Sequence, residues 1–271
     1  MTEQEKEFLL DGMTWSFSRV NAYCTCPRMF QLTYIDEKPK LQNAFAEWGT
    51  LGHSLFERYY KGELEFYELA DAYRNEYETA VSTPFPFPRM GAGYYANGLS
   101  FFENFDNSTY ENYEVIGVEE KAKTVIEGFE FIGYIDLILR DKEGRYVIVD
   151  HKSKSDFKTA DEFNHYLLQL YLYARFVHEK YGEYPARLEF NMFRANKTAS
   201  EEFDIKKLKS AEQWFVSTIK KAYADNEYSD KVSLDYELKY KDIAEFKKDD
   251  FFCNNLCSVR NFCERSKSEE L

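Results

Sequence analysis

Two pieces of sequence decide the fold: Gly133-Tyr134-Ile135-Asp136-Leu137-Ile138 and Tyr146-Val147-Ile148-Val149-Asp150-His151-Lys152-Ser153. Both are rich in β-branched and other apolar residues, a composition that predicts strands. Between them, Asp141-Lys142-Glu143-Gly144 is a hairpin turn signal. The sequence therefore predicts two neighbouring antiparallel strands, each with one acid in apolar company.

The acids and the lysine of this stretch are candidates for a metal site. Side chains alternate across a strand, so Asp150 and Lys152 point to the same face. A carboxylate buried in a sheet is costly unless it is paired or binds a cation. Asp136 and Asp150 together suit a hard divalent ion such as Mg²⁺ or Mn²⁺, and Lys152 would hold an attacking water or stabilise charge on a phosphate. The alternative from the residues alone is a salt bridge without a catalytic role.

Composition bounds the class of protein. The 271 residues, 44% hydrophobic and 18% aromatic, suffice for one large domain or two small ones with a real core. No apolar run is long enough to span a membrane, and the acidic start of the chain lacks the order of a signal peptide. We therefore expect a cytoplasmic protein. A net charge of −13 argues weakly against a surface coated for DNA binding, but not against a cleft lined with lysines.

Helices precede and follow a run of strands. Ser16 or Ser18 is the expected N-cap of a short helix, and Pro27 fits the first turn of the next. Further helices are expected at 44–61, 64–80, 93–105, 161–181 and 206–226, and strands at 115–119, 122–126, the central pair, 187–193 and 201–205. This order is typical of an α/β domain with a mixed sheet. The early helices would form an insertion or cap on it.

Two more residues could join the acidic centre. Glu119 ends a predicted strand, with Glu120 competing for the role, and the simplest alternative is a solvated strand end. His53 lies in a predicted helix just after Gly49 and Gly52. Because glycine within a helix costs about 1 kcal/mol relative to alanine, the pair suggests close approach of another backbone or of a substrate. Alone, His53 would be an ordinary polar residue on a helix flank.

A helix pair and a set of thiols complete the candidates. Gln169 and Tyr173 share a helix face and would meet the acidic centre or a nucleic-acid strand, unless the helix is merely amphipathic. Near the end of the chain, three cysteines follow closely: Cys253, Cys257 and Cys263. In a reducing compartment they point to a metal or cluster, not to disulfides. The fourth ligand would be Cys26, or Cys24 in its place, and spacing alone does not separate zinc from iron–sulfur.

Taken together, these residues resemble the PD-(D/E)XK nuclease superfamily. The most similar branch is the RecB-like nucleases with a C-terminal iron–sulfur cluster, such as the nuclease domain of AddB and the CRISPR-associated RecB-like exonucleases. The matching motifs follow in chain order: Ser16-Phe17-Ser18-Arg19, Cys26-Pro27-Arg28, Gly52-His53, Gly133-Tyr134-Ile135-Asp136, Asp150-His151-Lys152, Gln169 with Tyr173, and Cys253, Cys257 and Cys263. The spacing Cys253-x3-Cys257 is wider than the C-x2-C common in that branch.

The resemblance implies a fold and its parts. The expected class is α/β, a restriction-endonuclease-like mixed central sheet flanked by helices, with an N-terminal helical insertion and a C-terminus clasped by an iron–sulfur cluster. We expect a single nuclease domain over 1–271, with the insertion at about 40–110, the catalytic core at about 115–205 and the cysteine-rich tail at 250–265.

The resemblance also implies a metal-dependent DNA exonuclease acting on DNA ends, in recombination, repair or a phage or CRISPR context. The implied Mg²⁺ or Mn²⁺ ligands are His53, Glu119, Asp136, Asp150 and the backbone carbonyl of His151. Lys152 would orient the attacking water, and Gln169 and Tyr173 would contact DNA or brace the site. A [4Fe–4S] cluster would join Cys26, Cys253, Cys257 and Cys263, with zinc as the alternative occupant. A helicase or recombination protein is the expected partner. The rival functions are an endonuclease or flap nuclease, and a non-catalytic DNA-binding or assembly subunit.

Overall fold

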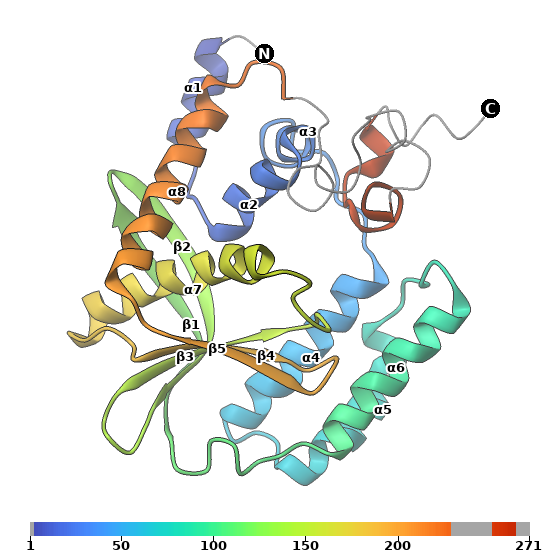
Figure 1. Ribbon diagram of the computed structural model, residues 1–271. Coiled ribbons are helices and arrows are strands. Elements are labelled where there is room, and N and C mark those ends of the chain that lie inside the picture. Colours follow the sequence, from blue (N-terminus) through green and yellow to red (C-terminus); the bar gives the residue numbers. More distant parts are fainter. Residues whose placement is uncertain (1–2, 229–250, 264–271) are drawn as a thin grey trace. The chain divides into compact units, whose positions relative to one another are not determined.

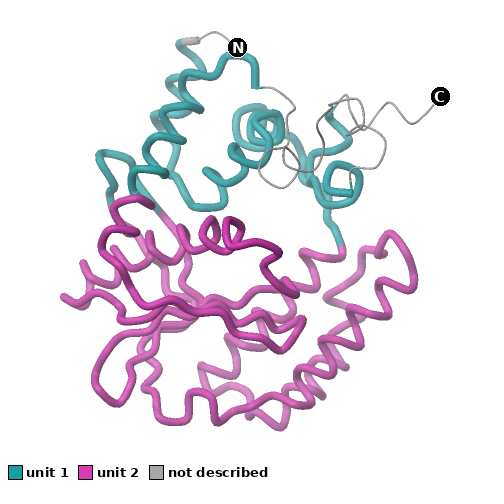
Figure 2. Tube along the Cα trace, in the orientation of Figure 1, with its two compact units in different colours: residues 1–43, 125–131, 212–271 teal, residues 44–124, 132–211 magenta. Residues whose placement is uncertain are grey.

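The computed structural model describes residues 3–228 and 251–263 (Figure 1). The chain forms two compact units, coloured separately in Figure 2. We call residues 44–124 and 132–211 the sheet unit, and residues 1–43, 125–131 and 212–271 the terminal unit. Residue 250 and residues 264–265 of the predicted cysteine-rich tail lie outside the described residues.

One mixed sheet organises the sheet unit. Its strands lie in the order β1 (Glu114–Ile126), β2 (Phe129–Arg140), β3 (Tyr146–Lys152), β4 (Arg187–Met192) and β5 (Lys197–Glu202). β3 pairs antiparallel with β2 and parallel with β4. All of β3 except its last residue is buried, as expected of an apolar strand covered on both faces. The predicted class, α/β with a mixed sheet flanked by helices, is confirmed, and it is consistent with a restriction-endonuclease-like fold.

Helices α7 (Ala160–Tyr181) and α4 (Ala44–Tyr60) cover opposite faces of β3. The Lys152 ammonium reaches Gln169 of α7, whereas the ring of its neighbour His151 stacks on Phe56 of α4. Local signals set the ends of α7, which begins one residue before the predicted range 161–181 and ends where that range ends. Thr159 caps its first turn by accepting from the backbone N–H of Glu162, and Gly182, with φ of 84°, takes the left-handed conformation that ends it.

Two more helices extend the core around α4. They are α5 (Leu69–Ala80), which follows the short helix η2 (Phe66–Glu68), and α6 (Pro88–Glu103). α5 packs on both α4 and α6. The buried Trp48 indole donates to the Tyr73 hydroxyl at 2.8 Å, so the one polar atom of that indole is satisfied inside an aromatic core. α4 is therefore held rigidly from the side that faces away from the sheet.

The terminal unit contains the helices from both ends of the chain. In order they are α1 (Glu3–Asp11), α2 (Phe17–Thr25), α3 (Pro27–Phe30), η1 (Gln31–Ile35), the greater part of α8 (Ile205–Ala224), η3 (Phe252–Leu256) and η4 (Arg260–Phe262). Ser16 caps α2 and Pro27 opens α3, as predicted. No helix among the described residues is both long and apolar enough to span a bilayer.

Several predicted boundaries were wrong. The strands expected at 115–119 and 122–126 form one strand, β1, which lies beside β2 in the sheet and runs through the polar residues between the two predicted ranges. β5 lies at Lys197–Glu202 and not at 201–205. It is a polar edge strand that pairs only with β4, so no apolar pattern marks it. Helix α6 begins at Pro88 and not at residue 93, and α1 was not predicted at all.

Candidate active site

The end of the β2–β3 pairing brings the two acids together. Leu137 pairs with Val149, so Asp136 and Asp150 occupy the next positions, where the two strands end their pairing. The backbone N–H of His151 donates to Asp136 Oδ2 at 2.7 Å, which fixes this carboxylate against β3. Asp136 is partly exposed, whereas Asp150 is 3% exposed. The hairpin predicted from the sequence thus places one acid toward solvent and one inside.

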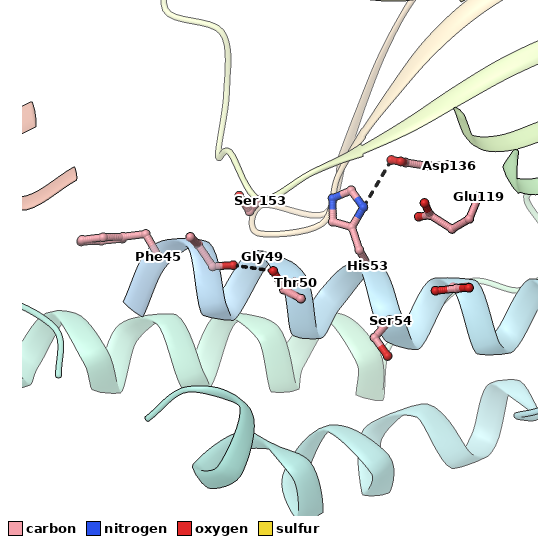
Figure 3. Close-up of a pocket in the computed structure, with 10 residues that line it drawn as sticks. Phe45, Gly49, Thr50, His53, Ser54, Glu119, Asp136 and Ser153 are labelled. Carbon is pink, nitrogen blue, oxygen red and sulfur yellow. Dashed lines mark hydrogen bonds and ion pairs between the residues drawn. The ribbon is translucent and has the colours of Figure 1, made fainter. Parts of the chain in front are cut away.

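Three candidate metal ligands converge from three elements. His53 projects from α4, Glu119 from β1 and Asp136 from β2, and Figure 3 shows His53 pointing toward Asp136 with Glu119 beside them. One ligand atom from each lies within 4.8 Å of the others, and His53 Nδ1 is 3.5 Å from Asp136 Oδ2. These side chains line an open cavity of about 520 Å³. The part of the chain that the structure describes contains no other group of three such ligand atoms.

The backbone of β1 selects between the two neighbouring glutamates. Glu119 has φ of 49°, a conformation that is costly for a residue with a side chain and that often marks functional sites. Glu120 is occupied elsewhere, since its carboxylate pairs with Lys180 and accepts from the Tyr181 hydroxyl at 3.1 Å. Glu119, and not Glu120, therefore lies beside His53 and Asp136.

The charged groups of this cluster shift one another's pKa. Burial and the neighbouring Asp136 raise the pKa of Glu119. Burial would also raise the pKa of Asp136, but the hydrogen bond and charge of His53 lower it. Burial opposes protonation of His53, yet Asp136 and then Asp150 raise the pKa of the imidazole. The cluster thus concentrates negative charge that a divalent cation would neutralise.

The donor set fits a hard divalent ion. Two carboxylates and one imidazole, on an open cavity with room for waters, suit Mn²⁺ or Mg²⁺ better than a soft metal. Asp150 is not part of the group of three, and its Oδ2 pairs with Lys152 Nζ at 2.7 Å. Burial, together with the charge of Asp136, raises the pKa of Asp150, and Lys152 opposes that shift.

Lys152 is held by a chain of hydrogen bonds from α7. Its ammonium donates to Gln169 Oε1 at 2.9 Å, and Gln169 Nε2 donates to the Tyr173 hydroxyl at 2.9 Å. Although burial alone would lower the pKa of Lys152, the charges of Asp150 and Asp136 raise it, so the group stays protonated. The structure therefore places Gln169 and Tyr173 at the acidic centre, which is one of the two positions that the sequence allowed for their shared helix face.

The glycines beside the site allow close approach of neighbouring side chains. A Cβ at Gly133 would lie 2.5 Å from Tyr173 Cε1, and one at Gly52 would lie 2.5 Å from Phe193 Cζ. Both distances are shorter than real Cβ contacts, so any larger residue would push the ring away. For Gly52, the neighbour that the sequence suggested is thus a packed phenyl ring, and not a backbone or a substrate.

His151 has a second set of contacts that the sequence did not reveal. Its ring stacks on Phe56 at a centroid distance of 4.0 Å, and its Nδ1 lies 3.0 Å from Nδ2 of Asn191 on β4. Burial lowers the pKa of this imidazole to about 3, so it is neutral. Phe56 lies one turn after His53 on α4, and no local pattern in the sequence indicated its contact with a residue of β3.

The four predicted cluster cysteines lie in the terminal unit. Met29, Phe252 and Cys253 pack against the buried Cys26, and Met29, Phe252 and Cys263 pack against a second buried cluster that contains Cys257. Burial raises the pKa of the Cys26 thiol to about 11, and the neighbouring Cys257 and Cys263 add to that shift.

The position of Cys24 and the number of clustered thiols limit which metal or cluster these cysteines could bind. Cys24 contacts Thr218 instead, at 4.0 Å. Four thiols match the ligand number that tetrahedral zinc or a four-iron cluster needs. Within residues 3–228 and 251–263, no three of these sulfur atoms all lie within 4.8 Å of one another, unlike the ligand atoms of His53, Glu119 and Asp136.

Comparison with known families agrees with this geometry. The family model of the PD-(D/E)XK nuclease superfamily matches residues 14–264, which is nearly the whole chain. The match spans all five strands and every candidate residue described above. No curated protein matches the chain significantly.

Proposed function

Because the chain belongs to the PD-(D/E)XK nuclease superfamily, we propose that it is a Mg²⁺- or Mn²⁺-dependent exonuclease that hydrolyses DNA from its ends. The superfamily makes it a hydrolytic nuclease with DNA as substrate. The observation that carries the proposal further is the position of Lys152. Its Nζ lies 2.7 Å from Asp150, on the strand that also fixes Asp136 beside His53 and Glu119.

Each residue has a role in the proposed reaction. His53, Glu119 and Asp136 would hold the ion, with Asp150 and the carbonyl of His151 as further ligands. When bound, the ion would polarise the phosphate and lower the pKa of a coordinated water. The protonated Lys152 donates hydrogen bonds from Nζ, so it can orient the attacking oxygen or stabilise charge on the phosphate. Gln169 and Tyr173 fix the direction of that ammonium.

Digestion of matched linear and circular DNA tests the proposal. Single- and double-stranded forms would be incubated with Mn²⁺ or Mg²⁺, using the wild type and Lys152→Ala side by side. We expect loss of linear DNA only, and no cleavage by the variant. Cutting of circles would make the protein an endonuclease on the same site. No cleavage by well-folded wild type would favour a non-catalytic subunit or dependence on a partner.

The biological setting forms part of the same proposal. DNA ends are processed in recombination, repair, and phage or CRISPR systems, and a net charge of −13 disfavours tight DNA binding by the chain alone. A helicase or recombination partner would supply both strand separation and DNA affinity. Cleavage that is weak alone and rises on addition of such a partner is the expected result.

We further propose that Cys26, Cys253, Cys257 and Cys263 hold a [4Fe–4S] cluster with a structural role. What supports it is that Met29 and Phe252 pack against both Cys26 and the buried cluster that contains Cys257, although Cys26 is far from the other three cysteines in sequence. Anaerobic purification should give a brown protein with iron and sulfide. A colourless protein with one zinc would assign the site to zinc instead.

A further inference from the structure

The hairpin of β1 and β2 has one buried face and one exposed face beyond the metal ligands. On β1, Ala122 and Thr124 are buried, whereas Lys121 and Lys123 are exposed. On β2, Ile135 is fully buried and Tyr134 is 53% exposed. The two strands are neighbours in one sheet, and side chains alternate between its two faces along each strand.

The buried face of this hairpin is the one covered by α7. The Thr124 hydroxyl donates to Glu179 of α7 at 2.6 Å, and a Cβ at Gly133 would meet the ring of Tyr173. The exposed face therefore points away from α7. Tyr134 precedes Asp136 by two residues on β2, so the two side chains share this face.

The exposed face also continues the metal site. Asp136 contacts His53 of α4 and lies with it on the open cavity. Two residues along a strand span about 7 Å, so Tyr134 lies roughly one nucleotide from the cluster. On β1, Lys121 follows Glu119 by two residues. Each of the two strands thus carries one metal-ligand candidate and, two residues nearer the turn at Glu127–Gly128, one exposed side chain suited to nucleic acid.

We propose that Tyr134 stacks on a nucleobase of single-stranded DNA beside the cleavage site, and that Lys121 pairs with a phosphate of that strand. This inference rests on the proposed function and names the form of its substrate. A phenol ring offers a base a large flat surface, but only an unpaired base exposes its face. Within residues 3–228 and 251–263, Lys121 forms no salt bridge, so its charge is available.

Two ordinary explanations compete with this proposal. Lysines on an edge strand such as β1 prevent unwanted pairing with other sheets. Single exposed aromatic residues are common and need no function. Neither explanation predicts that replacing one exposed tyrosine weakens binding of single-stranded DNA while replacing a more exposed tyrosine elsewhere does not.

Fluorescence anisotropy with a labelled oligo(dT), and with a duplex of the same length, tests the proposal. Variants would be made in the Lys152→Ala background with Mn²⁺, so that binding is measured apart from cleavage. If that background still cuts the strand, the catalytic assignment fails, and binding is then read from KM. Tyr67→Thr is the matched control, because Tyr67 is 68% exposed and lies in η2 of the same unit.

The expected results are specific to the two residues. Tyr134→Thr should raise the Kd for oligo(dT) by about 5- to 150-fold, whereas Tyr134→Phe keeps the ring and should bind like the wild type. The logarithm of the association constant for oligo(dT) falls linearly with the logarithm of the salt concentration. Lys121→Ala should make this slope shallower by about 0.7, and Lys142→Ala in the β2–β3 turn should leave it unchanged. An unchanged Kd for Tyr134→Thr overturns the proposal, and equal losses on duplex and single strand would indicate duplex docking instead.

Discussion

Replacing Gly133 with alanine probes the link between the sheet and the catalytic lysine. The new Cβ would stand 2.5 Å from Tyr173 Cε1 and 3.0 Å from its hydroxyl oxygen. Carbon atoms prefer separations of about 3.5–4.0 Å, so the ring must move by roughly 1 Å. Overpacking of this kind costs about 1–3 kcal/mol of folding free energy.

The same displacement should reach the chemistry. The Tyr173 hydroxyl holds Gln169, which holds Lys152 Nζ, and a misplacement of about 1 Å near a catalytic group can lower the rate by roughly 100-fold. We therefore expect Gly133→Ala to lower both the free energy of unfolding and kcat. Urea unfolding and single-turnover cleavage of linear DNA measure the two effects.

Two further variants serve as controls for this prediction. Gly93→Ala lies in α6 with nothing within 4 Å of the new Cβ, so it should stabilise the protein by about 0.5–1 kcal/mol. Tyr173→Leu removes the ring, and adding Gly133→Ala to it should then cost less than Gly133→Ala costs alone. Unchanged unfolding of Gly133→Ala, or full additivity in the double variant, would refute the reasoning.

Three other predictions concern the lysine, the ion and the thiols. Gln169→Leu removes an acceptor of the Lys152 ammonium and should lower kcat by about 10-fold or more, the usual size of a lost positioning contact. Gln169→Glu keeps the acceptor and should lower kcat less. Equal kcat values in both variants would contradict this. Mn²⁺ should raise Tm, because the ion relieves repulsion between Glu119 and Asp136. At 100 times its Kd, it should stabilise the folded state by about 2.7 kcal/mol. A Tm that does not change with Mn²⁺ in calorimetry would count against the site. Cys257→Ala should lower Tm of the cluster-loaded protein, since metal binding contributes to folding, whereas Cys24→Ala should lower it less; the reverse order would exclude Cys257 from the ligand set.

Much of the site could be predicted because strand alternation and hairpin geometry are local rules. The turn at Asp141–Gly144 and the apolar run of β3 were enough to place Asp136 opposite Asp150 and to put Lys152 on the same face as Asp150. The i, i+4 spacing of Gln169 and Tyr173 likewise gave their shared face.

Other features depend on long-range contacts that no local pattern records. The choice of Glu119 over Glu120 follows from the backbone conformation of β1 and from the distant Lys180. The reason for Gly52 is the Phe193 ring, more than a hundred residues away in sequence. The polar edge strand β5 forms because β4 needs a partner, and its own sequence gives little sign of it.

The most direct test of the central claim is to measure Mn²⁺ binding and DNA cleavage together in Asp136→Asn. The substitution keeps the shape of the side chain but removes the charge that lies beside His53 and Glu119. Titration calorimetry should show Mn²⁺ affinity that is much weaker than in the wild type, and linear DNA should remain intact, while the unfolding midpoint in urea stays near the wild-type value. Cleavage at the wild-type rate, or unchanged Mn²⁺ affinity, would contradict the account.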